Sequence, residues 1–123
     1  MTKTIAATER ELITQTVLDY FEGWYDGDVE RMNRALHPEL VKRWPGEDHG
    51  ATLGITTKER MLELTGHGAG KPDGADRSLA IEIDDATDET ASVTVRSAVY
   101  HEYLHLVRTA EGWKIANALW RYS

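Results

Sequence analysis

The C-terminal part of the chain alternates between apolar and polar positions on both sides of a glycine. Residues 103–109 and 113–121 each change character at every second position, and Glu111-Gly112 lies between them. Alternation on both sides of a Gly-containing turn is typical of a β-hairpin. Because strand side chains alternate with a period of two, each strand of this hairpin presents one set of side chains to each face of the sheet.

The two faces of the predicted hairpin differ in character. With residues 109–112 as the connection, one face is mostly large and aliphatic and consists of Glu102, Leu104, Leu106, Arg108, Trp113, Ile115, Asn117 and Leu119. The other face is aromatic, small and histidine-bearing and consists of His101, Tyr103, His105, Val107, Lys114, Ala116, Ala118 and Trp120. We take the aliphatic face as the core face, which turns Glu102 and Asn117 toward the interior. Buried polar groups are costly unless they have partners or line a cavity, so this arrangement predicts a pocket.

The two-residue period continues upstream of the hairpin. Apolar residues alternate with polar ones over residues 79–83 and again over residues 93–99, with a turn expected at residues 85–89. The apolar positions are odd-numbered up to Val99 and even-numbered from Glu102. A strand cannot change parity without a turn or a bulge, so one is expected near residues 99–101. These runs and the hairpin together predict a four-stranded antiparallel meander.

The N-terminal half follows a helical period instead. Thr8 and Glu11 form a candidate capping box that opens a long helix. Its apolar stripe consists of Ile13, Val17, Tyr20, Phe21 and Trp24. A short second helix is expected after the candidate N-cap Asp28 and ends before His37-Pro38, because the residue before a proline disfavours the helical conformation.

The middle of the chain adds a short strand over residues 40–44, a polar loop, and a third helix from the candidate cap Thr56 to Gly66. The Gly-rich residues 66–74 are expected to be flexible linker or lid material. The element order therefore predicts an α+β fold, in which three helices pack against one face of a curved antiparallel sheet.

Composition narrows the classes of function. A chain of 123 residues and 13.9 kDa is expected to form a single domain over residues 1–123. It contains no cysteine, and its net charge of -7 argues against nucleic acid or an anionic membrane as partner. No apolar run approaches the roughly 20 residues of a membrane span, and residues 1–8 lack the apolar stretch of a signal peptide. A cytoplasmic location is therefore expected.

Four sequence segments carry a resemblance to a known superfamily. They are Tyr20-Phe-Glu-Gly-Trp-Tyr-Asp-Gly-Asp28, Leu36-His-Pro-Glu39, Glu102-Tyr-Leu-His-Leu-Val-Arg108 and Gly112-Trp-Lys-Ile-Ala-Asn-Ala-Leu-Trp120. With the order of elements, they resemble the nuclear transport factor 2-like superfamily, in particular its lumazine-binding branch, beside the ketosteroid isomerases and polyketide cyclases of the SnoaL-like group. The resemblance implies a cone-shaped sheet around a long helix, an internal pocket at the wide end, and a dimer through the outer face of the sheet. The branch usually has Asp where this chain has Glu102.

Glu102 and Tyr20 are the candidate catalytic residues. A carboxylic acid in an apolar cavity has a raised pKa, which suits a general base or acid near neutral pH. The alternative for Glu102 is a structural pair with Arg108, Arg121 or Arg43. Tyr20 could donate its hydroxyl to a developing oxyanion, as ketosteroid isomerases do from a comparable helix. The alternative for Tyr20 is an ordinary core aromatic.

Several further residues are candidates for binding a ligand. Asn117 could bind a carbonyl group, or be a buried amide satisfied by the backbone. Large aromatic side chains could form flat walls for a planar ligand or simply belong to the core, and they are Trp24, Trp44 and Trp113. His37 either caps the second helix or reaches the mouth of the pocket, and Arg43 is a further candidate. Neither a cofactor nor a metal ion is expected.

The outer face of the predicted hairpin is the candidate dimer interface. Its small and aromatic residues suit a two-fold contact, and the candidates are His101, Tyr103, His105, Ala116, Ala118 and Trp120. His101 and His105 lie about 13 Å apart along a strand, too far to share a metal ion.

Three hypotheses about function follow. The first is a dimeric pocket protein that binds a small, largely apolar or planar molecule. The second is an isomerase, cyclase or dehydratase that moves a proton beside a carbonyl, with Glu102 as base and Tyr20 or Asn117 stabilising the enolate. The third is a structural dimerisation module.

Overall fold

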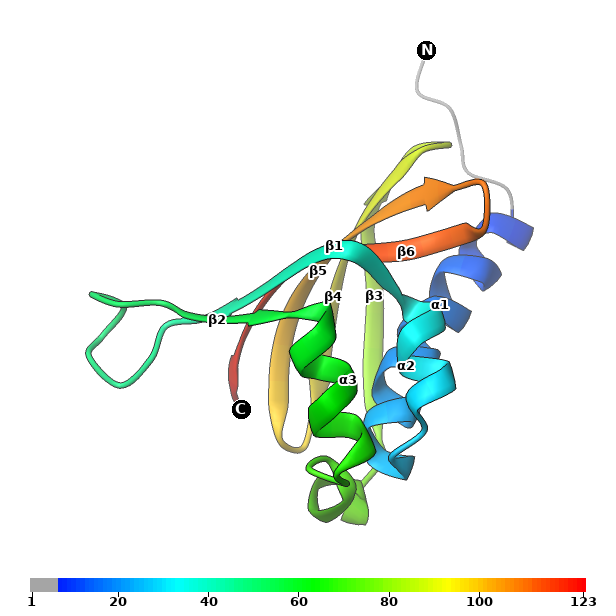
Figure 1. Ribbon diagram of the computed structural model, residues 1–123. Helices are drawn as coiled ribbons and strands as arrows, with labels where there is room; N and C mark the ends of the chain where they lie inside the picture. Colours follow the sequence, from blue (N-terminus) through cyan, green and yellow to red (C-terminus); the bar gives the residue numbers. More distant parts are fainter. Residues whose placement is uncertain (1–6) are drawn as a thin grey trace.

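The helices of the protein lie on one side of a curved sheet (Figure 1). A computed structural model describes residues 7–123; residues 1–6, within the segment expected to lack a signal peptide, lie outside this description. The helices are α1 (Ala7–Asp26), α2 (Val29–Ala35), α3 (Lys58–Gly66) and the 3-10 helix η1 (Lys71–Ala75). The strands are β1 (Leu36–Trp44), β2 (Gly54–Thr57), β3 (Leu79–Ala86), β4 (Thr90–Ser97), β5 (Tyr100–Thr109) and β6 (Gly112–Tyr122).

The sheet has six strands in the order β2-β1-β6-β5-β4-β3. The meander from β3 to β6 is antiparallel, as predicted, and β1 pairs with β6 in parallel. This pairing makes the sheet mixed rather than purely antiparallel, because α2 runs directly into β1 and delivers it alongside the last strand. The predicted α+β class, with a long N-terminal helix on the curved sheet, is confirmed.

Local capping explains where the helices begin. The Asp28 carboxylate accepts a hydrogen bond from the Arg31 backbone N–H (3.1 Å), so the predicted cap of α2 is confirmed. For α3 the cap is Thr57, which accepts from the Arg60 N–H (3.3 Å), and the prediction of Thr56 was wrong by one residue. The predicted N-cap Thr8 was wrong, because α1 already includes Ala7 and Thr8 lies inside the helix.

The parity change between the run at residues 93–99 and the hairpin has a simple cause. Strand β4 ends at Ser97 and β5 begins at Tyr100, so Ala98 and Val99 form a tight connection. The Ser97 hydroxyl accepts from the Tyr100 N–H (2.9 Å) across it. The turn expected near residues 99–101 is present, and it leaves Glu102 on the inner face.

A β-bulge in β6 overturns part of the predicted register. Arg108 pairs with Trp113 and Leu106 with Ile115 as expected, but His105 then pairs with Asn117, which leaves Ala116 as an extra residue. Because one extra residue reverses the faces, every later side chain of β6 lies opposite to its predicted side.

Asn117 and Leu119 therefore face outward and are exposed, whereas Ala118 and Trp120 face inward. The predictions that Asn117 points into the interior and that Ala118 and Trp120 lie on the outer face were wrong.

Candidate functional site

Strand β5 carries Glu102 into the interior of the sheet. Glu102 shares the inner face of the strand with Leu104 and Leu106, and only 2% of the residue is exposed. A buried carboxylate requires a partner, since an isolated buried charge is strongly unfavourable. The sequence-based expectation that Glu102 faces inward holds, and its partners define the site.

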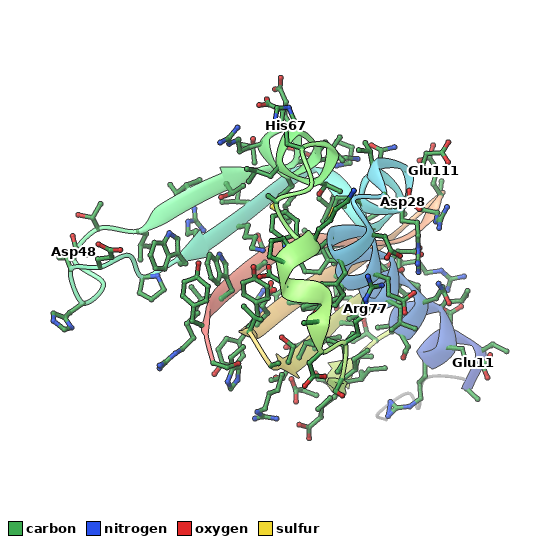
Figure 2. The ribbon with its side chains drawn as sticks, turned by 90° about the horizontal axis from the view of Figure 1, so that it is seen from below. Glu11, Asp28, Asp48, His67, Arg77 and Glu111 are labelled. Carbon is green, nitrogen blue, oxygen red and sulfur yellow. The ribbon has the colours of Figure 1, made fainter. Side chains whose placement is uncertain are left out.

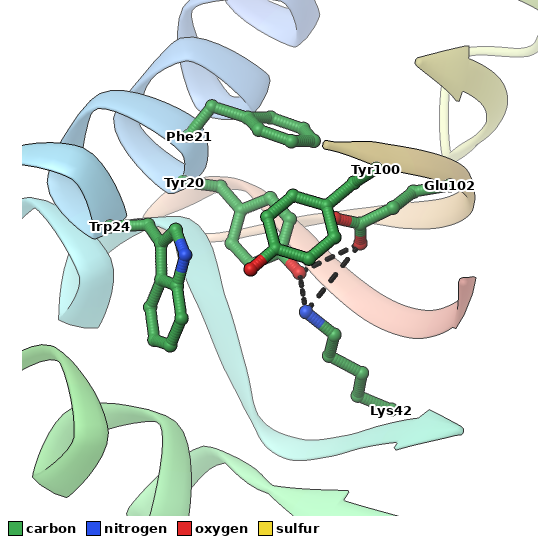
Figure 3. A pocket seen from close by; sticks show the side chains of 6 residues that line it. All are labelled: Tyr20, Phe21, Trp24, Lys42, Tyr100 and Glu102. Atoms are coloured by element: carbon green, nitrogen blue, oxygen red, sulfur yellow. Dashed lines mark hydrogen bonds and ion pairs between the residues drawn. The ribbon is translucent and has the colours of Figure 1, made fainter. Parts of the chain in front are cut away.

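Tyr20 and Lys42 are those partners. Figure 3 shows the three side chains converging from α1, β1 and β5. The Tyr20 hydroxyl donates to Glu102 Oε1 (2.8 Å), and the Lys42 ammonium donates to the Tyr20 oxygen. Lys42 Nζ lies 3.7 Å from the same Glu102 oxygen. The predicted Arg108, Arg121 and Arg43 are not the groups that pair with Glu102; a lysine on β1 is.

Aromatic rings enclose the Lys42 ammonium. Its Nζ lies 5.0 Å from the centre of the Tyr20 ring, 5.2 Å from Trp120 and 6.0 Å from Tyr100. A cation at this distance from a ring is attracted to its electron-rich face. Trp44 stacks on the far side of Trp120, with ring centres 5.3 Å apart. The charge on Lys42 is thus held by one carboxylate and three rings.

Burial changes the acidity of two members of the group. Burial, followed by the charge of Glu102, raises the pKa of Tyr20 well above its ordinary value of 10.0, so its hydroxyl stays protonated. Burial also lowers the pKa of the Lys42 amine from its ordinary value of 10.5, although Glu102 opposes this change. Tyr20 is therefore a persistent donor, while the proton on Lys42 is held less firmly than on an exposed lysine.

A small cavity adjoins these groups. It is lined by Tyr20, Phe21, Trp24, Lys42, Tyr100 and Glu102, and its volume of about 10 Å³ leaves room for about one water molecule. The hollow is therefore too small for an organic ligand in this conformation. Any larger guest needs movement of the walls.

The segment around η1 covers one side of the cavity. The Trp24 indole N–H donates to Asp73 Oδ2 (2.9 Å), and the Tyr100 hydroxyl donates to the same oxygen (2.5 Å). Gly70 lies directly against Trp24, because a Cβ built at Gly70 would be 2.3 Å from the Trp24 carbonyl oxygen. Residues 66–74, expected as linker or lid, are thus an ordered cover that touches two cavity walls.

The other predicted ligand residues lie outside this cavity. Trp113 is buried at the opposite end of α1, where its indole N–H donates to Glu9 (2.7 Å). His37 Nδ1 accepts from the Glu39 N–H (3.0 Å) on β1. Arg43 points outward, like Asn117, with which it shares the outer face. Of the predicted aromatic walls, Trp24 lines the cavity, whereas Trp44 stacks on Trp120 outside it.

The outer face carries some of the residues predicted to lie on it. His101, Tyr103 and His105 lie there on β5, and Ala116 lies at the bulge beside them. The inward turn of β6 removes Ala118 and Trp120 from this face. Leu119 takes their place and is 48% exposed.

Lys42, Tyr100 and Asp73 were missed by the sequence analysis. Lys42 could have been found, because residues 40, 42 and 44 of one strand share a side, and the other two are Leu40 and Trp44. The same period excludes Arg43 from the side that holds Trp44. Tyr100 shares the parity of Glu102. Asp73 has no local pattern, since its contacts come from α1 and β5.

The arrangement offers defined chemistry. Lys42 donates a hydrogen bond to the Tyr20 oxygen, and Tyr20 donates its one hydroxyl hydrogen to Glu102. A polar group of a guest can join this chain of hydrogen bonds, and Tyr20 becomes a donor to the guest when it releases Glu102. Within residues 7–123 no group of three or more His, Asp or Glu side chains is placed to hold a metal ion. In that same part of the chain, no helix is long and apolar enough to cross a bilayer.

The curved sheet around α1, with a polar group at its interior, defines the nuclear transport factor 2-like class of α+β proteins. A family model described as "Putative lumazine-binding" matches residues 8–121, and the chain belongs to this family. No curated protein matches the chain at a significant level.

Solved structures share the fold at low sequence identity. A nuclear transport factor 2-like protein of unknown function from Shewanella baltica OS155 is 13% identical, with a TM-score of 0.75 and 98% of each chain covered. A ketosteroid isomerase-like protein from Erwinia carotovora atroseptica SCRI1043 is 17% identical, with a TM-score of 0.62, over 95% of this chain and 98% of that one. A protein from Novosphingobium aromaticivorans, named as a putative aromatic ring hydroxylase, is 14% identical, with a TM-score of 0.66, over 97% and 92%. At these identities the likeness establishes the fold alone.

Proposed function

We propose that the protein binds a small, largely apolar or planar molecule in an enlarged form of the cavity beside Glu102. The observation that carries this proposal is the buried chain of Lys42, Tyr20 and Glu102 among aromatic walls. Two buried charges cost several kcal/mol each in desolvation, and apolar side chains would serve a purely structural interior at least as well. Their presence is explained by a ligand that uses them.

Each residue has a part in this proposal. Lys42 donates a hydrogen bond to an oxygen of the ligand, Tyr20 does so once it releases Glu102, and Glu102 then accepts from an N–H or O–H group of the ligand. Phe21, Trp24 and Tyr100 provide flat apolar surfaces. The family description supports a small-molecule ligand of this type. The other predicted residues are left out of the proposed site because none of them lines the cavity, and they are His37, Arg43, Trp44, Trp113 and Asn117.

Native mass spectrometry of the purified protein tests the proposal. The matched control is a triple variant, Tyr20→Phe, Lys42→Met and Glu102→Leu, which removes every member of the polar chain while keeping the volume similar. The wild type is expected to carry an additional small mass that the triple variant lacks. An equal load on both proteins would contradict the assignment of the site.

Proton transfer is the second candidate function, and the position of the Tyr20 hydroxyl and the Lys42 ammonium beside the Glu102 carboxylate favours it. A carboxylate that removes a proton beside a carbonyl needs donors at the developing enolate oxygen, and Tyr20 and Lys42 are such donors. The earlier alternative, Asn117, faces away from the site. The test is the exchange of hydrogen for solvent deuterium at the carbon beside the carbonyl of a bound ketone. Exchange that the wild type catalyses and Glu102→Gln does not would support this function.

We also propose that two copies of the chain associate through the outer face of the sheet. Ile55, Arg43, Leu119 and Tyr103 lie in one row across four neighbouring strands. The apolar and aromatic members, Ile55, Leu119 and Tyr103, are 63%, 48% and 47% exposed. A row of this kind suits a two-fold contact, and it also supports the alternative of a structural dimerisation module.

A further inference from the structure

Asp73 receives two hydrogen bonds on a single oxygen at the edge of the cavity. The Trp24 N–H and the Tyr100 O–H come from α1 and β5, and both side chains also line the cavity. Figure 3 shows the indole nitrogen of Trp24 and the hydroxyl of Tyr100 on the same side of the group. Two neutral donors that converge on one point form a binding site for a hydrogen-bond acceptor. In this structure the Asp73 carboxylate occupies that site.

Apart from Asp73, the segment around η1 is held by Gly70 against Trp24 and by Arg77 over the Tyr25 ring. No residue of η1 is buried, and Asp73 supplies its hydrogen bonds to cavity walls. Next to η1, Arg77 pairs with Asp26 (2.7 Å), but both side chains are nearly half exposed. Figure 2, seen from below, shows the ribbon beside Arg77 lying across this end of the molecule. Segments with little buried surface and exposed ion pairs open at low cost.

We propose that Asp73 occupies the place of a ligand carboxylate, so that the pocket takes a planar organic acid whose carboxylate displaces Asp73 from Trp24 and Tyr100. This inference rests on the function proposed above and adds the chemical class of the ligand. Opening of η1 frees both donors and gives the planar part of the acid access to the aromatic walls. Asp73 is thereby an internal competitor of the ligand.

The chemistry of the exchange favours an acid over a neutral molecule. Hydrogen bonds to a carboxylate are about twice as strong as those between neutral groups, so a neutral acceptor loses to Asp73 at this position. One carboxylate replacing another leaves the charge beside Trp24 and Tyr100 unchanged. Burial and the hydrogen bond to Asp73 raise the pKa of Tyr100, which keeps this hydroxyl protonated as a donor. The Lys42 ammonium, 6.0 Å from the Tyr100 ring, offsets the charge of Glu102, which lines the same cavity.

Benzoate and its neutral counterpart benzyl alcohol are the probes, and ligand-observed NMR titration measures their dissociation constants. Removing an internal competitor raises the apparent affinity by the inverse of the open fraction. We therefore expect Asp73→Ala and Asp73→Asn to bind benzoate about tenfold more tightly than the wild type, because each removes a charged acceptor. Asp73→Asn keeps the size of the side chain and covers the case in which the alanine variant does not fold.

Two controls make the result specific. Asp76→Ala lies in the same segment, where Asp76 accepts from the Ser78 N–H, and it should bind benzoate as the wild type does. Adding Tyr100→Phe to Asp73→Asn should remove most of the gain, because one of the two donors is lost.

The outcomes separate this inference from the proposed function. Benzyl alcohol binding as tightly as benzoate, or equal benzoate affinity in the wild type and both Asp73 variants, overturns the inference and leaves the proposed pocket standing. Absence of binding by either probe to any variant overturns both.

Discussion

Glu102 and Lys42 depend on each other, because removal of either leaves a buried charge without its partner. The pair is joined through Tyr20, so three side chains from three elements share one electrostatic balance. The stability change of a single substitution therefore includes the cost of the buried charge that is left unpaired, as well as the loss of the substituted side chain.

Glu102→Gln should therefore lower the free energy of unfolding by about 3 kcal/mol, since Lys42 stays buried without a counter-charge. The triple variant Tyr20→Phe, Lys42→Met and Glu102→Leu should lose less than about 1 kcal/mol, because no buried polar group is left unpaired. Urea denaturation of both proteins checks this. Equal losses in the two variants would mean that the polar chain is not coupled as the structure indicates.

Tyr20 gives the stability of the fold a defined pH dependence. Its pKa is raised in the folded state, so above pH 10 the unfolded chain releases this proton while the folded protein keeps it. Stability then falls as the pH rises, by about 1.4 kcal/mol per pH unit for one such group. The lowered pKa of Lys42 acts in the opposite direction, but only up to its ordinary value of 10.5, above which the amine is neutral in both states.

Tyr20→Phe should accordingly make the loss of stability between about pH 11 and 12 shallower by about 1.4 kcal/mol per pH unit. Chemical denaturation at several pH values in this window measures the slope. Phe21→Leu is the control, since it removes core volume but no ionisable group and should shift the curve without altering its slope. Identical slopes for wild type and Tyr20→Phe would show that another group governs alkaline unfolding.

At the scale of elements, most of the fold follows from two periodicities in the sequence. The helical stripe through Ile13, Val17 and Tyr20 and the two-residue period from Leu79 onward fix α1 and the meander, because each pattern buries one face. Strand β1 was predicted too short, and β2 was not predicted. Their pairing is set by the parallel contact with β6, a long-range partner that local patterns do not contain.

The bulge at Ala116 decided which site residues were predicted correctly. Glu102 and Tyr20 lie on regular elements, so their inward position followed from the pattern. Asn117, Ala118 and Trp120 follow the bulge, and nothing in the flanking residues marks it. One extra residue was enough to place Asn117 on the outer face and Ala118 and Trp120 on the inner face, the reverse of the prediction.

Deleting Ala116 should be tolerated, because the neighbouring pairs Leu106 with Ile115 and His105 with Asn117 then become consecutive and keep their faces. We expect a loss of about 1–2 kcal/mol from the altered local twist. Deleting Ala118 is the matched control and should abolish cooperative unfolding, since it turns Leu119 inward and Trp120 outward. Circular dichroism during thermal unfolding distinguishes the two. A deletion of Ala116 that unfolds the protein would contradict this register.

At the scale of the whole molecule, the two faces of the sheet have separate tasks. The inner face, together with α1, encloses the polar group, and the outer face exposes a row of apolar side chains. A substitution on the outer row can therefore alter association without changing the pocket.

Leu119→Glu should convert the proposed dimer into monomers, because it places a charge at the centre of this row. Leu12→Glu is the control, since Leu12 is similarly exposed (53%) but lies on α1, and it should leave the association unchanged. Sedimentation velocity measures both. A Leu119→Glu variant that sediments as the wild type does would refute an interface at the outer face.

The central claim is that the buried chain of Lys42, Tyr20 and Glu102 is a ligand-binding group rather than a feature of the core. The most direct test is a ligand-observed NMR screen of planar carbonyl and carboxylate compounds against the wild type and the folded triple variant. We predict compounds that bind the wild type with micromolar to millimolar dissociation constants and lose at least about tenfold in affinity for the triple variant, the loss of one good hydrogen bond to a charged group. Equal affinities for the two proteins, or no binding to the wild type at millimolar concentration, would contradict the account.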